Sequence, residues 1–177
     1  MSDPLFDAFW ARFATSAPPG EPHAPSRALA PSETLRALPA DFVRWLTLRS
    51  ALRIDHPRFS VSPAECARHG GDWLGLALAR HHAMRALTDA YDNPLLARTV
   101  PFADSPDGLE LALDLGEGAI IALDPARYDH GADAVRSVLA PDATRFVRAL
   151  LDEHAPQPPH ARAPSALTAL EKRRPHS

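Results

Sequence analysis

The stretch of sequence that decides the fold is Val100–Asp124, VPFADSPDGLELALDLGEGAIIALD. Its second half has a leucine at every second position: Leu109, Leu111, Leu113 and Leu115. A period of two places these side chains on one face of a pleated strand. Gly116 and Gly118 then bound a short loop, and Ala119–Leu123 has the composition of a returning strand. The stretch predicts a β-hairpin in an antiparallel sheet, with the leucine face on the core and the other face in water.

The same stretch concentrates negative charge. It contains no Lys, Arg or His and six acidic residues: Asp104, Asp107, Glu110, Asp114, Glu117 and Asp124. The chain has a net charge of −3, so the −6 of this stretch leaves +3 for the remainder. Two interpretations stay open: the acids solvate an outer sheet face and its turns, or they form part of a surface that binds a partner.

The whole chain has the length and composition of one domain with tails. Its 177 residues are enough to bury a core, and a slightly negative net charge argues against a general nucleic-acid binder. Cys66 is the only cysteine, which excludes an intramolecular disulfide and a cysteine-ligated zinc site. We expect neither a leader peptide nor a membrane span, because the first residues lack a basic segment followed by an apolar one and no apolar run approaches about 18 residues. We expect a cytoplasmic protein without a membrane or nucleic-acid partner.

Helical periodicity marks both ends of the chain. Ser2 is expected to cap a short helix with an apolar stripe of Leu5, Phe6, Phe9, Trp10 and Phe13. The four aromatic side chains favour packing on the domain's own core over docking to a partner. Near the other end, Asp142 is expected to cap a final helix with an apolar stripe of Ala143, Phe146, Val147, Leu150 and Leu151.

The middle of the chain is expected to contain two more helices and further strands. Residues 32–49 predict a helix that breaks at Pro39, and residues 80–91 predict a helix ended by Asn93-Pro94. Trp73–Leu78 fits either a strand or the beginning of that second helix. Short strands are expected at residues 59–61 and 134–139, with turns at 56–57, 70–71 and 129–131.

Proline-rich segments divide the chain. Residues 1–31 are expected to be a helix followed by an extended arm, residues 32–154 a single domain, and residues 155–177 a flexible basic tail. The elements together predict an α+β fold: a mainly antiparallel sheet flanked by helices, with a helical N-terminus and a C-terminal capping helix.

The histidines do not follow a known metal pattern. His81 and His82 are adjacent, so on a helix they point about 100° apart, whereas a zinc helix places histidines at i and i+4. His69 and Asp72 could join them only through tertiary contacts. We therefore expect no metal, and keep a metal-dependent enzyme using these four residues as the weakest alternative.

Signals for other catalytic sites are also missing from the sequence. No serine stands in a Gly-x-Ser-x-Gly elbow, and there is no Gly-rich phosphate loop. Glu110 and Asp114 are four residues apart on one strand face, or roughly 13 Å, which is too far for a glycosidase pair. We expect no catalytic residues and no cofactor.

Several motifs of the chain resemble those of the SUKH superfamily. They are Leu38-Pro39-Ala40-Asp41-Phe42 at the start of a helix, Pro101-Phe102-Ala103 before an alternating strand that ends in Leu113-Asp114-Leu115, and Phe146 near the start of the last helix. The resemblance covers residues 33–154. Two features depart from the family: Arg49-Ser50-Ala51 stands where an Asn-Gly is usual, and residues 50–75 are longer and less strand-like.

The resemblance implies an α+β domain without catalytic residues. Most bacterial members look like immunity proteins that bind and neutralise a cognate toxin, and others look like intracellular adaptor or regulatory modules. A protein partner is therefore expected, with Asp104, Asp107, Glu110, Asp114, Glu117 and Asp124 as the candidate partner-binding residues. For an adaptor, the aromatic N-terminal helix and the proline-rich arm would be the docking parts.

Overall fold

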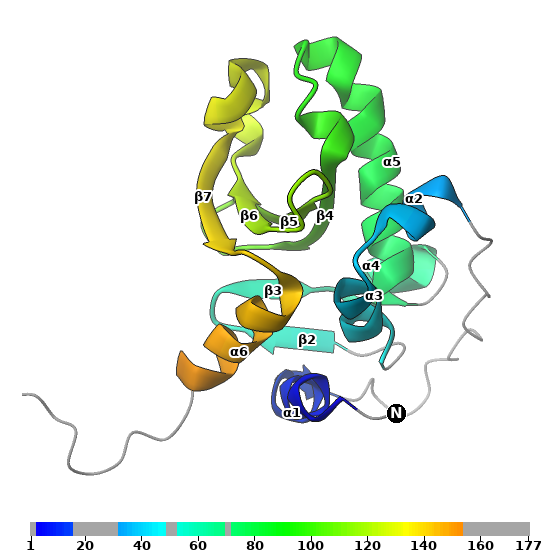
Figure 1. The fold of residues 1–177 in the computed structure, drawn as a ribbon, viewed down its shortest axis with the longest axis vertical. Helices are drawn as coiled ribbons and strands as arrows, with labels where there is room; N and C mark the ends of the chain where they lie inside the picture. The colour runs from blue at the N-terminus through cyan, green and yellow to red at the C-terminus, as the bar shows by residue number, and fades with distance from the viewer. Residues whose placement is uncertain (1–2, 16–31, 49–52, 70–71, 154–177) are drawn as a thin grey trace, which may run out of the picture.

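The computed structural model describes residues 3–15, 32–48, 53–69 and 72–153 (Figure 1). Within them, seven strands form one antiparallel sheet in chain order, β1 to β7. The strands are Ala14–Thr15 (β1), Arg53–His56 (β2), Phe59–Val61 (β3), Thr99–Asp104 (β4), Glu110–Asp114 (β5), Ile120–Leu123 (β6) and Val135–Ala140 (β7). The fold is α+β with helices flanking the sheet, as the sequence predicts.

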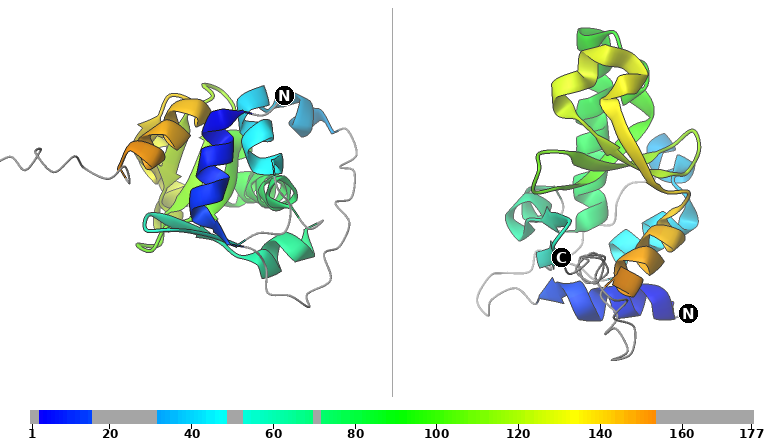
Figure 2. Two further views of the ribbon diagram at one scale, coloured as in Figure 1. Left: turned by 90° about the horizontal axis from the view of Figure 1, so that it is seen from below. Right: turned by 90° about the vertical axis from the view of Figure 1, so that its left-hand side faces the viewer.

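Six α-helices and two 3₁₀ segments are described. They are Pro4–Phe13 (α1), Glu33–Ala37 (α2), Ala40–Thr47 (α3), Pro63–Arg68 (α4), Trp73–Tyr91 (α5), Ala143–Glu153 (α6), Leu96–Arg98 (η1) and Pro125–Ala134 (η2). Figure 2 shows α1 and α6 at the end of the molecule opposite to η2, with α5 running along its length. None of the described helices is both long and apolar enough to cross a bilayer.

The predicted hairpin is present as β5 and β6. Leu111 pairs with Ala122 and Leu113 with Ile120. The side chains of Ile120 and Ala122 therefore lie on the same face of the sheet as the leucines of β5. Leu111 and Leu113 are buried in the larger of two hydrophobic clusters, whereas Ala112, between them, is buried in the second cluster. The expectation that the second face of the hairpin lies in water is therefore wrong.

Both faces are covered because the helices pack on two sides of the sheet. The larger cluster joins the sheet to α1, α3, α6 and the first half of α5. The second cluster joins it to the second half of α5, through Met84, and to η1 and η2, through Leu96 and Tyr128. Apolar burial on both faces is the main source of stability for such an arrangement.

The N-terminal helix is part of the larger core. Its cap is Asp3, whose carboxylate accepts the Leu5 N–H at 3.1 Å, rather than Ser2 as expected. The ring centroids of Phe9 and Trp45 are 5.3 Å apart, and the Trp10 indole N–H donates a hydrogen bond to the Trp45 carbonyl at 2.9 Å. The prediction that these aromatics pack on the domain's own core is confirmed. Removal of α1 would open that core, so α1 is not a detachable docking segment.

The helix expected over residues 32–49 breaks at Pro39 into α2 and α3, as predicted. Asp41, in the first turn of α3, also reaches the start of α6. Its carboxylate accepts the N–H of Thr144 at 3.2 Å and the hydroxyl of the same residue at 3.0 Å. Phe42 is fully buried beside it. The Leu38–Phe42 motif therefore ties α3 to α6 and has a structural role.

Trp73–Leu78 is helix, not strand, because α5 begins at Trp73. The Asp72 carboxylate caps α5 by accepting the Gly75 N–H at 2.5 Å. The carbonyl of His69 lies so close that a Cβ on Gly75 would stand 2.1 Å from its oxygen. Only glycine fits there. Asp92, in the left-handed region with φ 48°, ends the helix before Asn93.

The later elements follow the predictions closely. Strand β7 matches the strand expected at residues 134–139, and the Asp142 carboxylate accepts the Arg145 N–H at 2.7 Å at the start of α6. Strand β2 was not predicted, and η2 extends well beyond the expected turn at 129–131. The predicted arm at 16–31, the turn at 70–71 and the tail at 155–177 lie outside the described residues.

Candidate functional site

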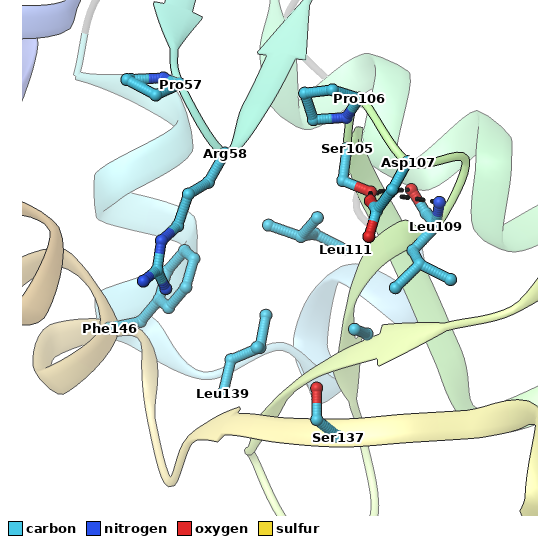
Figure 3. Close-up of a pocket in the computed structure, with 11 residues that line it drawn as sticks. Pro57, Arg58, Ser105, Pro106, Asp107, Leu109, Leu111, Ser137, Leu139 and Phe146 are labelled. Carbon is cyan, nitrogen blue, oxygen red and sulfur yellow. Dashed lines mark hydrogen bonds between the residues drawn. The ribbon is translucent and has the colours of Figure 1, made fainter.

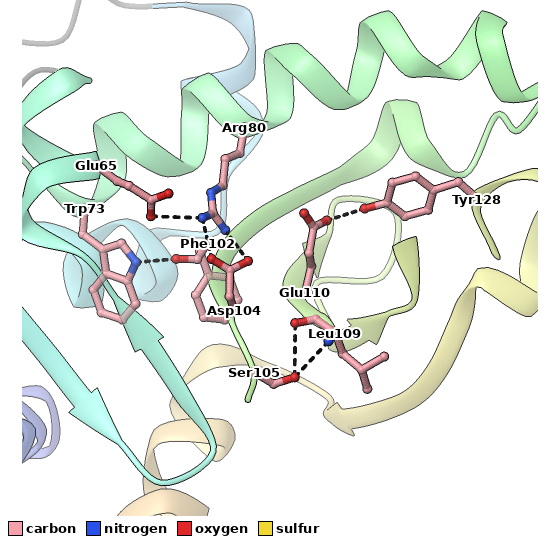
Figure 4. Close-up of polar contacts among 9 residues, drawn as sticks. All are labelled: Glu65, Trp73, Arg80, Phe102, Asp104, Ser105, Leu109, Glu110 and Tyr128. Atoms are coloured by element: carbon pink, nitrogen blue, oxygen red, sulfur yellow. Dashed lines mark hydrogen bonds and ion pairs between the residues drawn. The ribbon is translucent and has the colours of Figure 1, made fainter. Parts of the chain in front are cut away.

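The acidic residues of the hairpin stretch do not form one open surface. Asp104 is bound by Arg80 of α5 through two contacts, at 3.0 and 2.7 Å, and the same guanidinium contacts Glu65 of α4 at 3.3 Å (Figure 4). Burial of the guanidinium opposes its charge, but the hydrogen bonds and charge of Asp104, with Glu65 and Glu110, raise the pKa of Arg80. The Asp104 carboxylate therefore serves as the counter-ion of Arg80.

Glu110 is engaged on the same side of the sheet. It stands opposite Asp104 in the β4–β5 pairing and accepts a hydrogen bond from the Tyr128 hydroxyl of η2 (Figure 4). Burial, and then this bond to a carboxylate, raise the pKa of Tyr128 above its usual range. The pair anchors η2 to the sheet.

Asp114 and Asp124 hold the ends of the two hairpin strands. Asp114 is buried, accepts the Gly116 N–H at 2.8 Å and pairs with Arg98 at 3.1 Å. Asp124 begins η2 by accepting the Ala126 N–H at 3.0 Å. Both carboxylates thus satisfy backbone donors of the turns that they begin.

Asp107 and Glu117 differ from the other four acids, since both are exposed on turns. Neither forms an ion pair with a cation among the described residues. The Asp107 carboxylate accepts a hydrogen bond from the Ser105 hydroxyl, which holds it within the β4–β5 turn. Gly108, with φ 84°, closes this turn in a conformation that favours glycine. Of the six predicted residues, these two have charges that remain available to a partner.

The four residues of the metal alternative are not brought together for ligation. His81 is buried and its Nδ1 lies 2.7 Å from the Thr99 carbonyl, while His82 and His69 are exposed. Asp72 caps α5. In the described part of the chain, no group of three or more His, Cys, Asp or Glu side chains could hold a metal ion.

A pocket of about 430 Å³ opens on the leucine face of the hairpin (Figure 3). It lies beyond the part of this face that α6 covers. Its lining comes from the β2–β3 turn, the β4–β5 turn, three strands and α6: Pro57, Arg58, Ser105, Pro106, Asp107, Leu109, Leu111, Ala122, Ser137, Leu139 and Phe146. Leu111, Ala122 and Ser137 are paired across β5, β6 and β7, so they form a row along its floor.

Two charged side chains of opposite sign stand on opposite walls at the opening of the pocket. Arg58 stands on one wall, where its guanidinium pairs with Glu153 of α6 at 2.9 Å, and Asp107 stands on the other (Figure 3). The Arg58 N–H donates to Nδ1 of His56 at 3.0 Å, which fixes the turn that carries it. The Leu109 N–H likewise donates to the Ser105 hydroxyl at 3.1 Å. Both walls are thus held in place by hydrogen bonds.

The pocket has the character of a binding site. Its volume falls in the range of about 300–1,000 Å³ that is usual for ligand sites, and its lining is largely apolar with a few polar groups. The polar side chains of its lining are Arg58, Ser105, Asp107 and Ser137, and the lining contains no His, Cys, Lys or Tyr. Such a lining can desolvate and orient an apolar group.

The sequence-based prediction missed this pocket. Of its lining, only Asp107 was a candidate partner-binding residue. Leu109 and Leu111 were assigned to a buried core, yet Leu109 is half-buried on the pocket wall. Leu139 is 36% exposed although it is apolar. The apolar residue Leu139 in the strand predicted at residues 134–139 is the available signal, and it is a weak one.

Comparison with known proteins adds no further assignment. Models of known families, curated proteins and solved structures were all compared with the chain, and none of them matches it. The molecule is an α+β domain with a largely apolar pocket on one face of its sheet. Membership of the SUKH superfamily stays a prediction from the motifs.

Proposed function

We propose that this protein is a non-catalytic binding protein, and specifically an immunity protein that neutralises a cognate toxin by direct contact. The observation that carries the proposal is the pocket of about 430 Å³ on the leucine face of the hairpin. An apolar pocket with ordered walls is the kind of site into which a protein partner inserts an anchor side chain. The SUKH-like motifs favour a toxin as that partner.

The contacts of the acidic residues favour the pocket over the whole acidic hairpin as the surface that binds a partner. Asp104, Glu110 and Asp114 each bind a group of the same chain, so their contribution to a partner is small. Asp107 is exposed and lies on the pocket wall. The contact surface proposed here is therefore centred on the pocket and includes Asp107, in place of the whole acidic hairpin.

Co-expression with the protein encoded by the neighbouring gene tests the proposal. The tagged full chain is expected to capture that protein, and to restore growth to cells in which the neighbour is toxic. Failure of the wild-type chain to bind or to protect would overturn the proposed function. If binding occurs but the neighbour is not toxic, the regulatory adaptor is the correct class.

Two adjacent residues of β7 offer a matched pair of variants. Leu139 lines the pocket, whereas Val138 does not line it and pairs with Ile121 of the second hydrophobic cluster. Val138 is also the more exposed of the two, at 65% against 36%. Leu139→Glu is expected to abolish capture and Val138→Glu to preserve it, because only the first places a charge in the pocket.

A further inference from the structure

We infer that the pocket takes a protein segment in which an aromatic or branched aliphatic side chain has a Lys or Arg close beside it. The inference rests on the proposed function, since it assumes that the chain acts by binding a protein. It adds the chemistry of the segment that is bound.

The apolar part of the segment follows from the floor and walls of the pocket. Leu109, Leu111 and Leu139, with Phe146, surround a space into which no described side chain of the protein itself extends. About 430 Å³ holds a large side chain together with some of its neighbouring backbone. Removal of such a side chain from water onto these four residues is favourable in proportion to the apolar area buried.

The basic part follows from the charges at the mouth. Arg58 is already neutralised by Glu153, at 2.9 Å. Asp107 is hydrogen-bonded to a neutral hydroxyl, that of Ser105, and pairs with no cation of the described chain. The unmatched charge on the walls is therefore negative, and a Lys or Arg next to the anchor complements it.

Two further features prepare the site for this occupant. The hydrogen bond from Ser105 holds the Asp107 carboxylate in place before binding, so little side-chain entropy is lost when a cation arrives. The Ser137 hydroxyl points into the pocket from β7 (Figure 3) and can bind a backbone group of the segment. An acidic segment would meet the Asp107 carboxylate at the mouth and is disfavoured.

A random dodecapeptide library displayed on phage tests the inference with the full chain as bait. Enriched peptides are expected to share an aromatic or branched aliphatic residue with Lys or Arg within two positions. Their recovery is expected to fall about tenfold or more on Leu139→Glu and to stay unchanged on Val138→Glu. Enrichment of acidic or uncharged motifs, or of no motif sensitive to Leu139→Glu, would overturn the inference.

Charge reversal separates the basic group from the apolar one. Asp107→Lys is expected to lower the binding affinity for a synthetic peptide of the selected motif about tenfold. A peptide with Glu in place of its Lys or Arg is expected to bind this variant more tightly and so to recover part of the lost affinity. Glu117→Lys is the control, since Glu117 is also an exposed acid on a turn but does not line the pocket. Equal effects of the two reversals would contradict a contact at Asp107.

The two proposals fail in different experiments. Capture of the neighbouring protein that survives Leu139→Glu would leave the proposed function standing and remove the pocket as its site. A selected basic-apolar motif together with no capture would remove the toxin as partner and keep the chemistry of the pocket. Self-association of the wild-type chain that Leu139→Glu abolishes would replace the inferred segment by a second copy.

Discussion

Mutation of the ion pair between Arg80 and Asp104 tests whether the acidic residues of the hairpin stabilise the protein itself. Two variants, Arg80→Met and Asp104→Asn, and their combination form a double-mutant cycle. Arg80 is 19% exposed and Asp104 46% exposed, and two short contacts join their charged groups. Met keeps the apolar stem of the Arg side chain, and Asn keeps the shape of Asp, so charge is the main change.

The expected energies follow from this geometry. Hydrogen bonds to charged groups contribute about 1.5–3 kcal/mol when well shielded, and exposed pairs contribute about 0.2–1 kcal/mol. With one partner mostly buried and the other half in water, we expect a coupling energy of about 1 kcal/mol. Arg80→Met alone should cost about 2 kcal/mol, because it also removes the positive charge that pairs with Glu65 and interacts with Glu110.

Urea unfolding followed by tryptophan fluorescence measures these energies. Trp10, Trp45 and Trp73 are all buried in the larger core, so their emission reports on its loss. Asp107→Asn and Glu117→Gln are the controls, and each should change the free energy of unfolding by less than about 0.5 kcal/mol. A coupling energy below about 0.3 kcal/mol would refute the reasoning, since Asp104 would then be as free as Asp107 to contact a partner.

Three further properties are expected of the isolated chain. Because burial and the bond to Glu110 raise the pKa of Tyr128 from its usual 10, stability is retained below that pH and lost above it. Tyr128→Phe should make the loss of thermal stability between about pH 9.5 and 11 shallower, and an unchanged slope would contradict this. Burial, and then the charge of Asp72, raise the pKa of the Cys66 thiol to about 11 from 9.0, so its reaction with a disulfide reagent at pH 8 should be at least about 100-fold slower than in urea. A rate within tenfold of the unfolded chain would show that this thiol is accessible. Gly75→Ala should destabilise the protein by about 1–3 kcal/mol in urea unfolding, because the new Cβ would clash with the His69 carbonyl. Helix propensity alone predicts a gain of about 1 kcal/mol, so stabilisation would refute the clash.

Much of the fold could be predicted from the sequence because the relevant signals are local. The alternating leucines of β5, the break at Pro39 and the cap at Asp142 each depend on residues within a few positions of one another. Periodicity and capping act over one strand or one helical turn, so no knowledge of the rest of the chain is needed. The sequence of Trp73–Leu78 fits both a strand and a helix. In the structure it is helical, and the Asp72 carboxylate caps this helix by accepting the Gly75 N–H.

The candidate site could not be predicted in the same way. Alternation showed that the two faces of β5 differ, but not which groups would cover each face. Arg80 from α5 and Tyr128 from η2 reach Asp104 and Glu110 from distant parts of the chain. They engage two of the six acidic residues in contacts within the protein.

The pocket is likewise a product of the tertiary structure alone. Its walls bring Arg58, Asp107, Leu139 and Phe146 together from separate segments of the chain. Helix α6 covers one part of the leucine face and leaves another part open, which depends on where α6 packs and not on the sequence of β5. Local patterns determine which side chains share a face, whereas packing between distant segments decides which of those side chains remain accessible to a partner.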